Sequence, residues 1–167
     1  MQYIGIDPGT QGALCSLNPG LKTCKFFNTP DSKLLSATLD ETFTWLLSTS
    51  TATTKAAIED VHSIFGMSAK SNFQFGRNLA FVETIVHLLF RKDRITYVTP
   101  KVWQKGCGIE FTYPEAATPA EKAKIRKLTI AGKALELYPD AQIYGPKGGL
   151  KDGRADALMI AHYLSLQ

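Results

Sequence analysis

Four acidic side chains stand where the sequence predicts the end of a strand or the start of a helix. Asp7 closes the apolar run QYIGI and precedes a Pro-Gly turn, and Glu59 closes the apolar run AAI. Asp152 and Asp156 are four residues apart in the last segment, and this spacing puts both on one face of a helix. Carboxylates in such places are candidate metal ligands, provided that the fold brings them together.

A cluster of these carboxylates needs a positive charge, because several negative groups at one point repel one another. Ligands that are all oxygen, without His or Cys, favour a hard cation such as Mg²⁺ or Mn²⁺. Two such ions would activate water and steady the leaving oxygen in phosphodiester hydrolysis. Each acid also has a structural interpretation: Asp7 as a turn residue, Glu59 as a surface charge and Asp152 as a helix N-cap. Spacing alone leaves both interpretations open.

The elements that must position the acids follow from hydrophobic periodicity and from turn residues. We predict strands over 2–7, 12–17, 21–27, 53–61 and 95–99. We predict helices over 31–48 and 77–91, from Thr118 or Pro119 to Pro139, and over 153–166. The segment 62–76 is predicted to be a loop, and 100–118 a short helix followed by a loop.

This order of elements predicts an α/β fold. Three early strands joined by short turns form an antiparallel meander, and the alternating helices and strands that follow add parallel strands to one mixed five-stranded sheet flanked by helices. If the first and fourth strands are neighbours, Asp7 and Glu59 lie side by side and the last helix presents Asp156 to both. Strand alternation turns Glu59 and Asp60 to opposite faces, so only one of them joins Asp7.

Bulk composition is that of one soluble globular domain covering 1–167, with 44% hydrophobic and 20% charged residues. No apolar run approaches the ~18 residues of a membrane span, and no signal peptide is visible, so we expect no membrane association and a cytoplasmic protein. The three cysteines are an odd number without metal-type spacing and fit reduced thiols. The formal net charge of +4 permits a polyanionic partner without requiring one.

Five segments in order make the chain resemble the RuvC-type Holliday junction resolvases, especially their short phage-like forms. They are IGIDPG at 4–9, AAIEDV at 56–61, SNFQFGRNLAFVETIV at 71–86, VTPKVWQKG at 98–106 and KDGRADALMIAHY at 151–163. The resemblance implies the RNase H-like fold and a homodimer that acts in DNA recombination and repair, from a bacterial or phage-infected cell. Such a dimer would bind a four-way DNA junction and nick two strands symmetrically, leaving 5′-phosphate ends.

The resemblance also implies which residues act. By carry-over, Asp7, Glu59 and Asp156 are catalytic ligands of Mg²⁺, with two ions per active site and Mn²⁺ as a substitute. Familiar bacterial members have an acid or His three residues before the last Asp, where this chain has Gly153, so Asp152 is the predicted fourth ligand. Two alternatives stay open: a broader nuclease for branched DNA, flaps or RNA–DNA hybrids, and a junction-binding protein that does not cut.

Basic and aromatic residues complete the predicted DNA interface. Lysines and arginines near the site would contact phosphates, and binding would then weaken with salt; the candidates are Lys101, Lys105, Lys122, Lys124, Arg126, Lys127 and Arg154. Phe65 is a candidate for stacking on an unpaired base, and His62 for touching DNA or assisting proton transfer. A solvated helix face, a core Phe and a structural His are the respective alternatives. Phe73, Phe75 and Trp103 are predicted to be core residues.

Overall fold

A mixed five-stranded sheet with the strand order β3-β2-β1-β4-β5 forms the centre of the protein. The computed structural model describes residues 1–29, 35–61 and 68–167, with the backbone alone at 35–37. The strands are β1 Tyr3–Asp7, β2 Ala13–Asn18, β3 Thr23–Asn28, β4 Lys55–Glu59 and β5 Ile95–Val98. β1, β2 and β3 pair antiparallel, whereas β4 pairs parallel with both β1 and β5. The predicted sheet is confirmed, and the first and fourth strands are neighbours, which is the condition for Asp7 and Glu59 to lie side by side.

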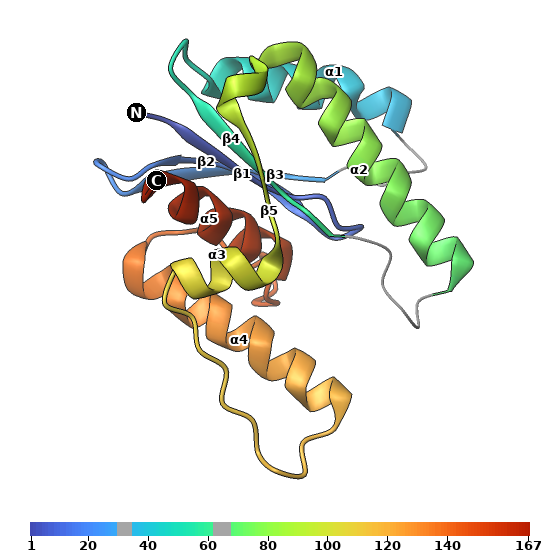
Figure 1. Cartoon of the computed structure of the whole chain (residues 1–167), viewed down its shortest axis with the longest axis vertical. Helices are drawn as coiled ribbons and strands as arrows, with labels where there is room; N and C mark the ends of the chain where they lie inside the picture. Colours follow the sequence, from blue (N-terminus) through green and yellow to red (C-terminus); the bar gives the residue numbers. More distant parts are fainter. Residues whose placement is uncertain (30–34, 62–67) are drawn as a thin grey trace.

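Helices cover both faces of this sheet (Figure 1). They are α1 Leu35–Thr49, α2 Ala69–Leu89, α3 Pro100–Gly106, α4 Pro119–Leu137 and α5 Asp152–Ser165, with a 3₁₀ turn at Lys92–Arg94. α1 and α2 lie over one face, and α3, α4 and α5 lie on the other. None of the helices in the described ranges is long and apolar enough to cross a membrane.

The prediction of a loop over 62–76 is wrong for its second half, because α2 begins at Ala69. The Ser68 side chain caps this helix by accepting a hydrogen bond from the amide of Ser71 at 3.1 Å. Weak apolar periodicity in this exposed first part of α2 hid the helix from the sequence analysis. Phe73 is also not a core residue, since 69% of its surface is exposed. Residues 62–67, with the predicted DNA contacts His62 and Phe65, lie outside the described residues.

The pleat of the two central strands sorts their side chains between the helical layers. Ile4, Ile6 and Ile58 belong to the core beneath α1 and α2. The alternate residue Ala57 belongs to the core that contains α5. Because successive side chains alternate between faces, Asp7 and Glu59 point to the α5 side of the sheet.

Helix α5 approaches β1 closely because glycines leave room for its backbone. A side chain on Gly5 would overlap the carbonyl oxygen of Ala157 and the amide nitrogen of Ala161. At the start of α5, Gly153 pairs with Gly12 in an isolated bridge, and a Cβ on Gly153 would lie only 2.6 Å from the Cα of Gly12. These two contacts place the first turns of α5 beside the end of β1.

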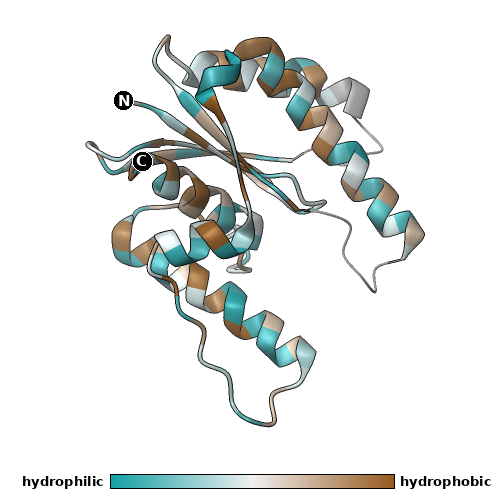
Figure 2. Cartoon of the chain, viewed as in Figure 1, coloured by the Kyte–Doolittle hydropathy of each residue, from teal (hydrophilic) through white to brown (hydrophobic). Residues whose placement is uncertain are grey.

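Helix α4 is anchored at one end only. Ile130, Ala131 and Ala134 are buried in its C-terminal half, whereas the preceding turns are largely exposed. A capping box between Thr118 and Glu121 begins the helix and ends the preceding loop. Figure 1 shows the N-terminal half of α4 extending away from the sheet. Figure 2 shows alternating hydrophilic and hydrophobic bands along this helix. The basic N-terminal half of α4 therefore faces solvent beside α5.

The close approach of α5 makes Gly5 a sensitive position. We expect Gly5→Ala to lower the free energy of unfolding by at least about 2 kcal/mol, because the added methyl group meets backbone that cannot give way. Gly76→Ala is the matched control: nothing lies within 4 Å of the added methyl group, and alanine favours the helix. Urea unfolding monitored by circular dichroism measures both. Equal stability of the two variants would contradict the proposed contact.

Candidate active site

The four predicted acids meet at the carboxyl ends of β1 and β4, next to the start of α5. The parallel register pairs Ile6 with Ile58, so the next residues, Asp7 and Glu59, lie side by side. Burial, the charge of Glu59 and the charge of Asp152 raise the pKa of Asp7 to about 7. Burial and the charges of Asp7, Glu59 and Asp152 raise the pKa of Asp156 well above its ordinary value. Each of the four carboxylates therefore lies within electrostatic reach of at least two of the others.

Each of three acids has a partner that fixes one of its oxygens. The Gly9 amide donates to Asp7 Oδ1 at 2.8 Å, so Asp7 is both a turn residue and a member of the acidic cluster. The Trp103 indole donates to Glu59 Oε1 at 2.9 Å. The Lys127 ammonium lies 2.5 Å from Asp152 Oδ2. The second oxygen of each carboxylate has no bond of this kind among the described residues.

Trp103 is the residue of the site that sequence analysis placed only in the core. It is indeed buried, with 1% of its surface exposed, and its position on α3 brings the indole N–H to Glu59. A buried tryptophan normally finds an acceptor for this N–H. That rule was the available signal, but the sequence does not say which acceptor it is.

Gly153 cannot carry a side chain in this fold. Its backbone packs against Gln11 and Gly12, leaving no space for a side chain. The carboxylate occurs instead at Asp152, the first residue of α5, which faces the same side as Asp156 one turn later. The N-cap of α5 is Lys151, so the structural interpretation of Asp152 as an N-cap is wrong.

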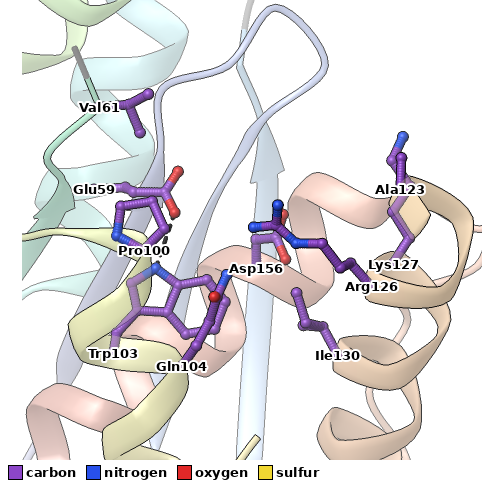
Figure 3. A pocket seen from close by; sticks show the side chains of 10 residues that line it. All are labelled: Glu59, Val61, Pro100, Trp103, Gln104, Ala123, Arg126, Lys127, Ile130 and Asp156. Atoms are coloured by element: carbon purple, nitrogen blue, oxygen red, sulfur yellow. Dashed lines mark hydrogen bonds between the residues drawn. The ribbon is translucent and has the colours of Figure 1, made fainter. Parts of the chain in front are cut away.

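A pocket of about 290 Å³ lies between α4 and two of the acids, Glu59 and Asp156. Glu59 and Trp103 line one side, Arg126 and Lys127 of α4 line the other, and Asp156 lies between them (Figure 3). Burial raises the pKa of Glu59, and the Trp103 hydrogen bond and the charge of Arg126 partly offset that rise. The pocket thus places negative and positive groups on opposite walls.

The other predicted phosphate contacts on α3 and α4 do not line this pocket. Lys122 is one helical turn before Arg126, with its ammonium 5.9 Å from the ring centre of Tyr113. Lys124 lines a separate, mainly apolar hollow of α4. Lys101 and Lys105 are exposed on α3. Their contacts with DNA stay predictions.

Arg154 has a structural role that its sequence context did not show. Its Nε donates to the side-chain oxygen of Asn28 at 2.9 Å, and its Nη1 donates to the carbonyl oxygen of Gln142 at 2.8 Å. The guanidinium also lies 5.7 Å from the ring centre of Phe26. Arg154 therefore ties β3 to the loop before α5, and a phosphate contact by it stays a prediction.

The arrangement of elements matches two solved structures of RuvC from Thermus thermophilus. RuvC in complex with a Holliday junction substrate has a TM-score of 0.63 at 14% identity, over 99% of this chain and 93% of that chain. The chain has the fold of RuvC. A second RuvC structure has a TM-score of 0.59 at 15% identity, over 99% of this chain and 96% of that chain. No protein-family model matches the sequence, and no curated protein matches it. The RuvC fold confirms the predicted RNase H-like architecture.

The donor chemistry of the cluster fits a hard divalent cation. All four side chains offer carboxylate oxygens, and their mutual repulsion would be relieved by a positive ion. In the described part of the chain, no three His, Cys, Asp or Glu side chains converge closely enough to hold a single ion as they stand. Binding would therefore draw the carboxylates inward, and Asp152 would have to share or leave Lys127.

The raised pKa of Asp7 predicts how stability changes with pH in metal-free buffer. Between about pH 4 and pH 7, the Asp7 carboxyl keeps its proton in the folded protein but has lost it in the unfolded chain. The free energy of unfolding therefore falls as pH rises through that range. Asp7→Asn removes the charge and keeps an oxygen for the Gly9 amide. We expect this variant to be more stable than the wild type at pH 8, by up to about 4 kcal/mol.

Urea unfolding in EDTA at pH 5 and pH 8 measures this effect. Asp93→Asn is the control, since Asp93 is an exposed carboxylate on the 3₁₀ turn, remote from the pocket. We expect the wild type and the Asp93 variant to lose stability between the two pH values and the Asp7 variant to lose less. The same pH dependence in all three proteins would contradict this prediction, because it would show that ionising Asp7 does not lower the free energy of unfolding.

Proposed function

We propose that the chain is a divalent-metal-dependent DNA endonuclease that resolves four-way junctions by paired, symmetric nicks. The observation that carries this proposal is the meeting of Asp7, Glu59, Asp152 and Asp156 on a RuvC fold, opposite a basic helix wall. A protein that only binds DNA gains nothing from an acidic cluster facing phosphates. In phosphodiester hydrolysis, these carboxylates would hold the metal ions that activate the attacking water.

Mg²⁺ is the proposed cofactor, with two ions per site and Mn²⁺ as a substitute. Bound there, the ions would supply an activated water and stabilise the leaving 3′ oxygen, which gives 5′-phosphate ends. Asp7 is influenced both by the charge of Glu59 on β4 and by that of Asp152 on α5, and it is the proposed shared ligand. We propose that Trp103 holds Glu59 in one orientation through its indole N–H, which leaves the other carboxylate oxygen for the metal.

The substrate side of the site is the positive wall of α4. Arg126 and Lys127 line the pocket, and Lys122 lies one turn beyond them. We propose that these cations hold the DNA backbone, so that binding weakens steeply as salt rises. Figure 3 shows Arg126 reaching from α4 into the pocket, opposite Trp103 and Glu59.

A homodimer belongs to the same proposal. Two copies related by a twofold axis would place two identical sites on a twofold-symmetric junction. Helix α2 is the proposed seam, since it carries the exposed apolar side chains Phe73 and Leu88. A bacterial or phage-infected cytoplasm is the proposed setting.

The deciding experiment uses a labelled synthetic four-way junction with the wild type and Asp7→Asn. We expect symmetric paired nicks in Mg²⁺ that disappear in EDTA and in the variant, while junction binding persists. The loss in Asp7→Asn should be at least about 10³-fold, because the variant removes a charge that the metal site requires. Flap, fork, RNA–DNA hybrid and linear duplex substrates are assayed in parallel to measure substrate preference.

Other outcomes favour the alternatives. Equal cutting of flaps, forks and junctions would indicate a broader nuclease for branched DNA, and preferred cutting of the hybrid would indicate a ribonuclease. Tight junction binding without cutting in Mg²⁺ or Mn²⁺ would contradict the endonuclease proposal and favour a binding protein.

Trp103 provides a test of how Glu59 is held. Trp103→Phe keeps most of the buried ring and removes the N–H donor. We expect cleavage to fall about 10- to 100-fold with junction affinity unchanged, because the ligand loses its fixed orientation. Titration with Mg²⁺, followed by thermal stabilisation, should show weaker metal binding in the same variant. An unchanged metal titration together with unchanged cleavage would contradict the orienting role.

A further inference from the structure

A strap formed by residues 107–118 runs from α3 to α4 and carries two aromatic rings that no predicted site included. Gly108 turns the chain at the end of α3 with a φ of 65°, and the Ile109 amide donates to the Gln104 carbonyl at 2.9 Å. Ile109 is buried, and Phe111 and Tyr113 are half-buried at the alternate positions that follow. This period of two keeps the three side chains on one side of the strap.

The two rings lie beneath two cations of α4. Phe111 and Tyr113 are stacked, with ring centres 6.2 Å apart and planes 18° apart. The Arg126 guanidinium carbon is 5.5 Å from the Phe111 ring centre, and the Lys122 ammonium is 5.9 Å from the Tyr113 ring centre. Both distances lie within the range of cation–π attraction.

Arg126 differs from its neighbour Lys127 in what holds it. Lys127 pairs with Asp152, whereas Arg126 has no hydrogen bond or ion pair within the described ranges of the chain. Stacking on a ring occupies one face of a guanidinium and leaves its N–H donors free at the edge. Arg126 also lines the pocket that contains Asp156, across from Glu59, so these donors are available where a phosphate would enter.

We infer that Phe111 is a positioning residue that aims Arg126 at a non-bridging oxygen of the phosphate being cut. The ring is packed against the core that contains α5, so Arg126 rests on a support that is continuous with the helix bearing Asp156. Tyr113 supports Lys122 through a similar cation–π contact. Lys122 does not line the pocket, so its proposed role is to bind the DNA backbone. The inference rests on the proposed nuclease function.

The test compares Phe111→Leu with Phe111→Tyr in single-turnover cleavage of the four-way junction at saturating protein. We expect Phe111→Leu to slow cleavage roughly 5- to 30-fold, since the orienting attraction is lost, with the junction Kd within about twofold of the wild type. Phe111→Tyr keeps the ring and should retain the wild-type rate. Tyr113→Leu is the matched comparison and should weaken binding without slowing the saturated rate.

A double-mutant cycle separates positioning from packing. Arg126→Ala should slow cleavage about 10²-fold, and adding Phe111→Leu to it should slow cleavage no further, because the side chain to be aimed is gone. The Nε–H signal of Arg126 in the free protein, assigned by its loss in Arg126→Lys, should show greater mobility in Phe111→Leu. If Phe111→Leu does not fold, Phe111→Met takes its place in each measurement.

Three results would overturn the inference alone: an unchanged rate in Phe111→Leu, an equal loss in the Arg126→Ala background, or an Arg126 signal equally ordered with and without the ring. A wild type that cuts none of the DNA substrates would overturn the proposed function, and the inference would fall with it.

Discussion

The close contact of α5 with β1 is the constraint on which the site depends. Gly5 has no side chain, so the backbone of α5 at Ala157 and Ala161 reaches the strand directly. Gly12 and Gly153 repeat this contact at the start of the helix. A side chain at position 5 would overlap the backbone of α5 and would hold the helix farther from the sheet. Asp156 would then be unable to share a site with the acids at the strand ends.

Bringing these acids together is unfavourable for the folded protein, and the structure compensates only in part. Burial and mutual repulsion raise the pKa of Asp7 and of Asp156. The Gly9 amide, the Trp103 indole and the Lys127 ammonium each stabilise one carboxylate. The repulsion that remains is what the proposed divalent cation would relieve. The same imbalance that weakens the metal-free fold at neutral pH would strengthen metal binding.

The two walls of the pocket are built differently, and each construction suits its proposed task. The acidic wall lies on the central strands and on α5, where backbone packing fixes it. The basic wall lies on the half of α4 that has little core beneath it, and the aromatic strap supplies the missing support. Metal ligands need fixed geometry, whereas phosphate contacts must admit a bulky duplex. The strap allows Arg126 to be oriented on an otherwise exposed helix.

Local rules were sufficient for much of the protein. Apolar alternation determined the strands, the pleat determined which face Asp7 and Glu59 share, and helical spacing put Asp152 and Asp156 together. These rules read the pattern of neighbouring residues, so they missed the start of α2, where that pattern has little apolar periodicity. Only the tertiary structure decided that Trp103 donates to Glu59, that Gly153 leaves no room for an acid, and that Phe111 lies under Arg126. These contacts join elements distant in the chain, and their partners depend on how closely helices pack on the sheet, which residue spacing does not encode.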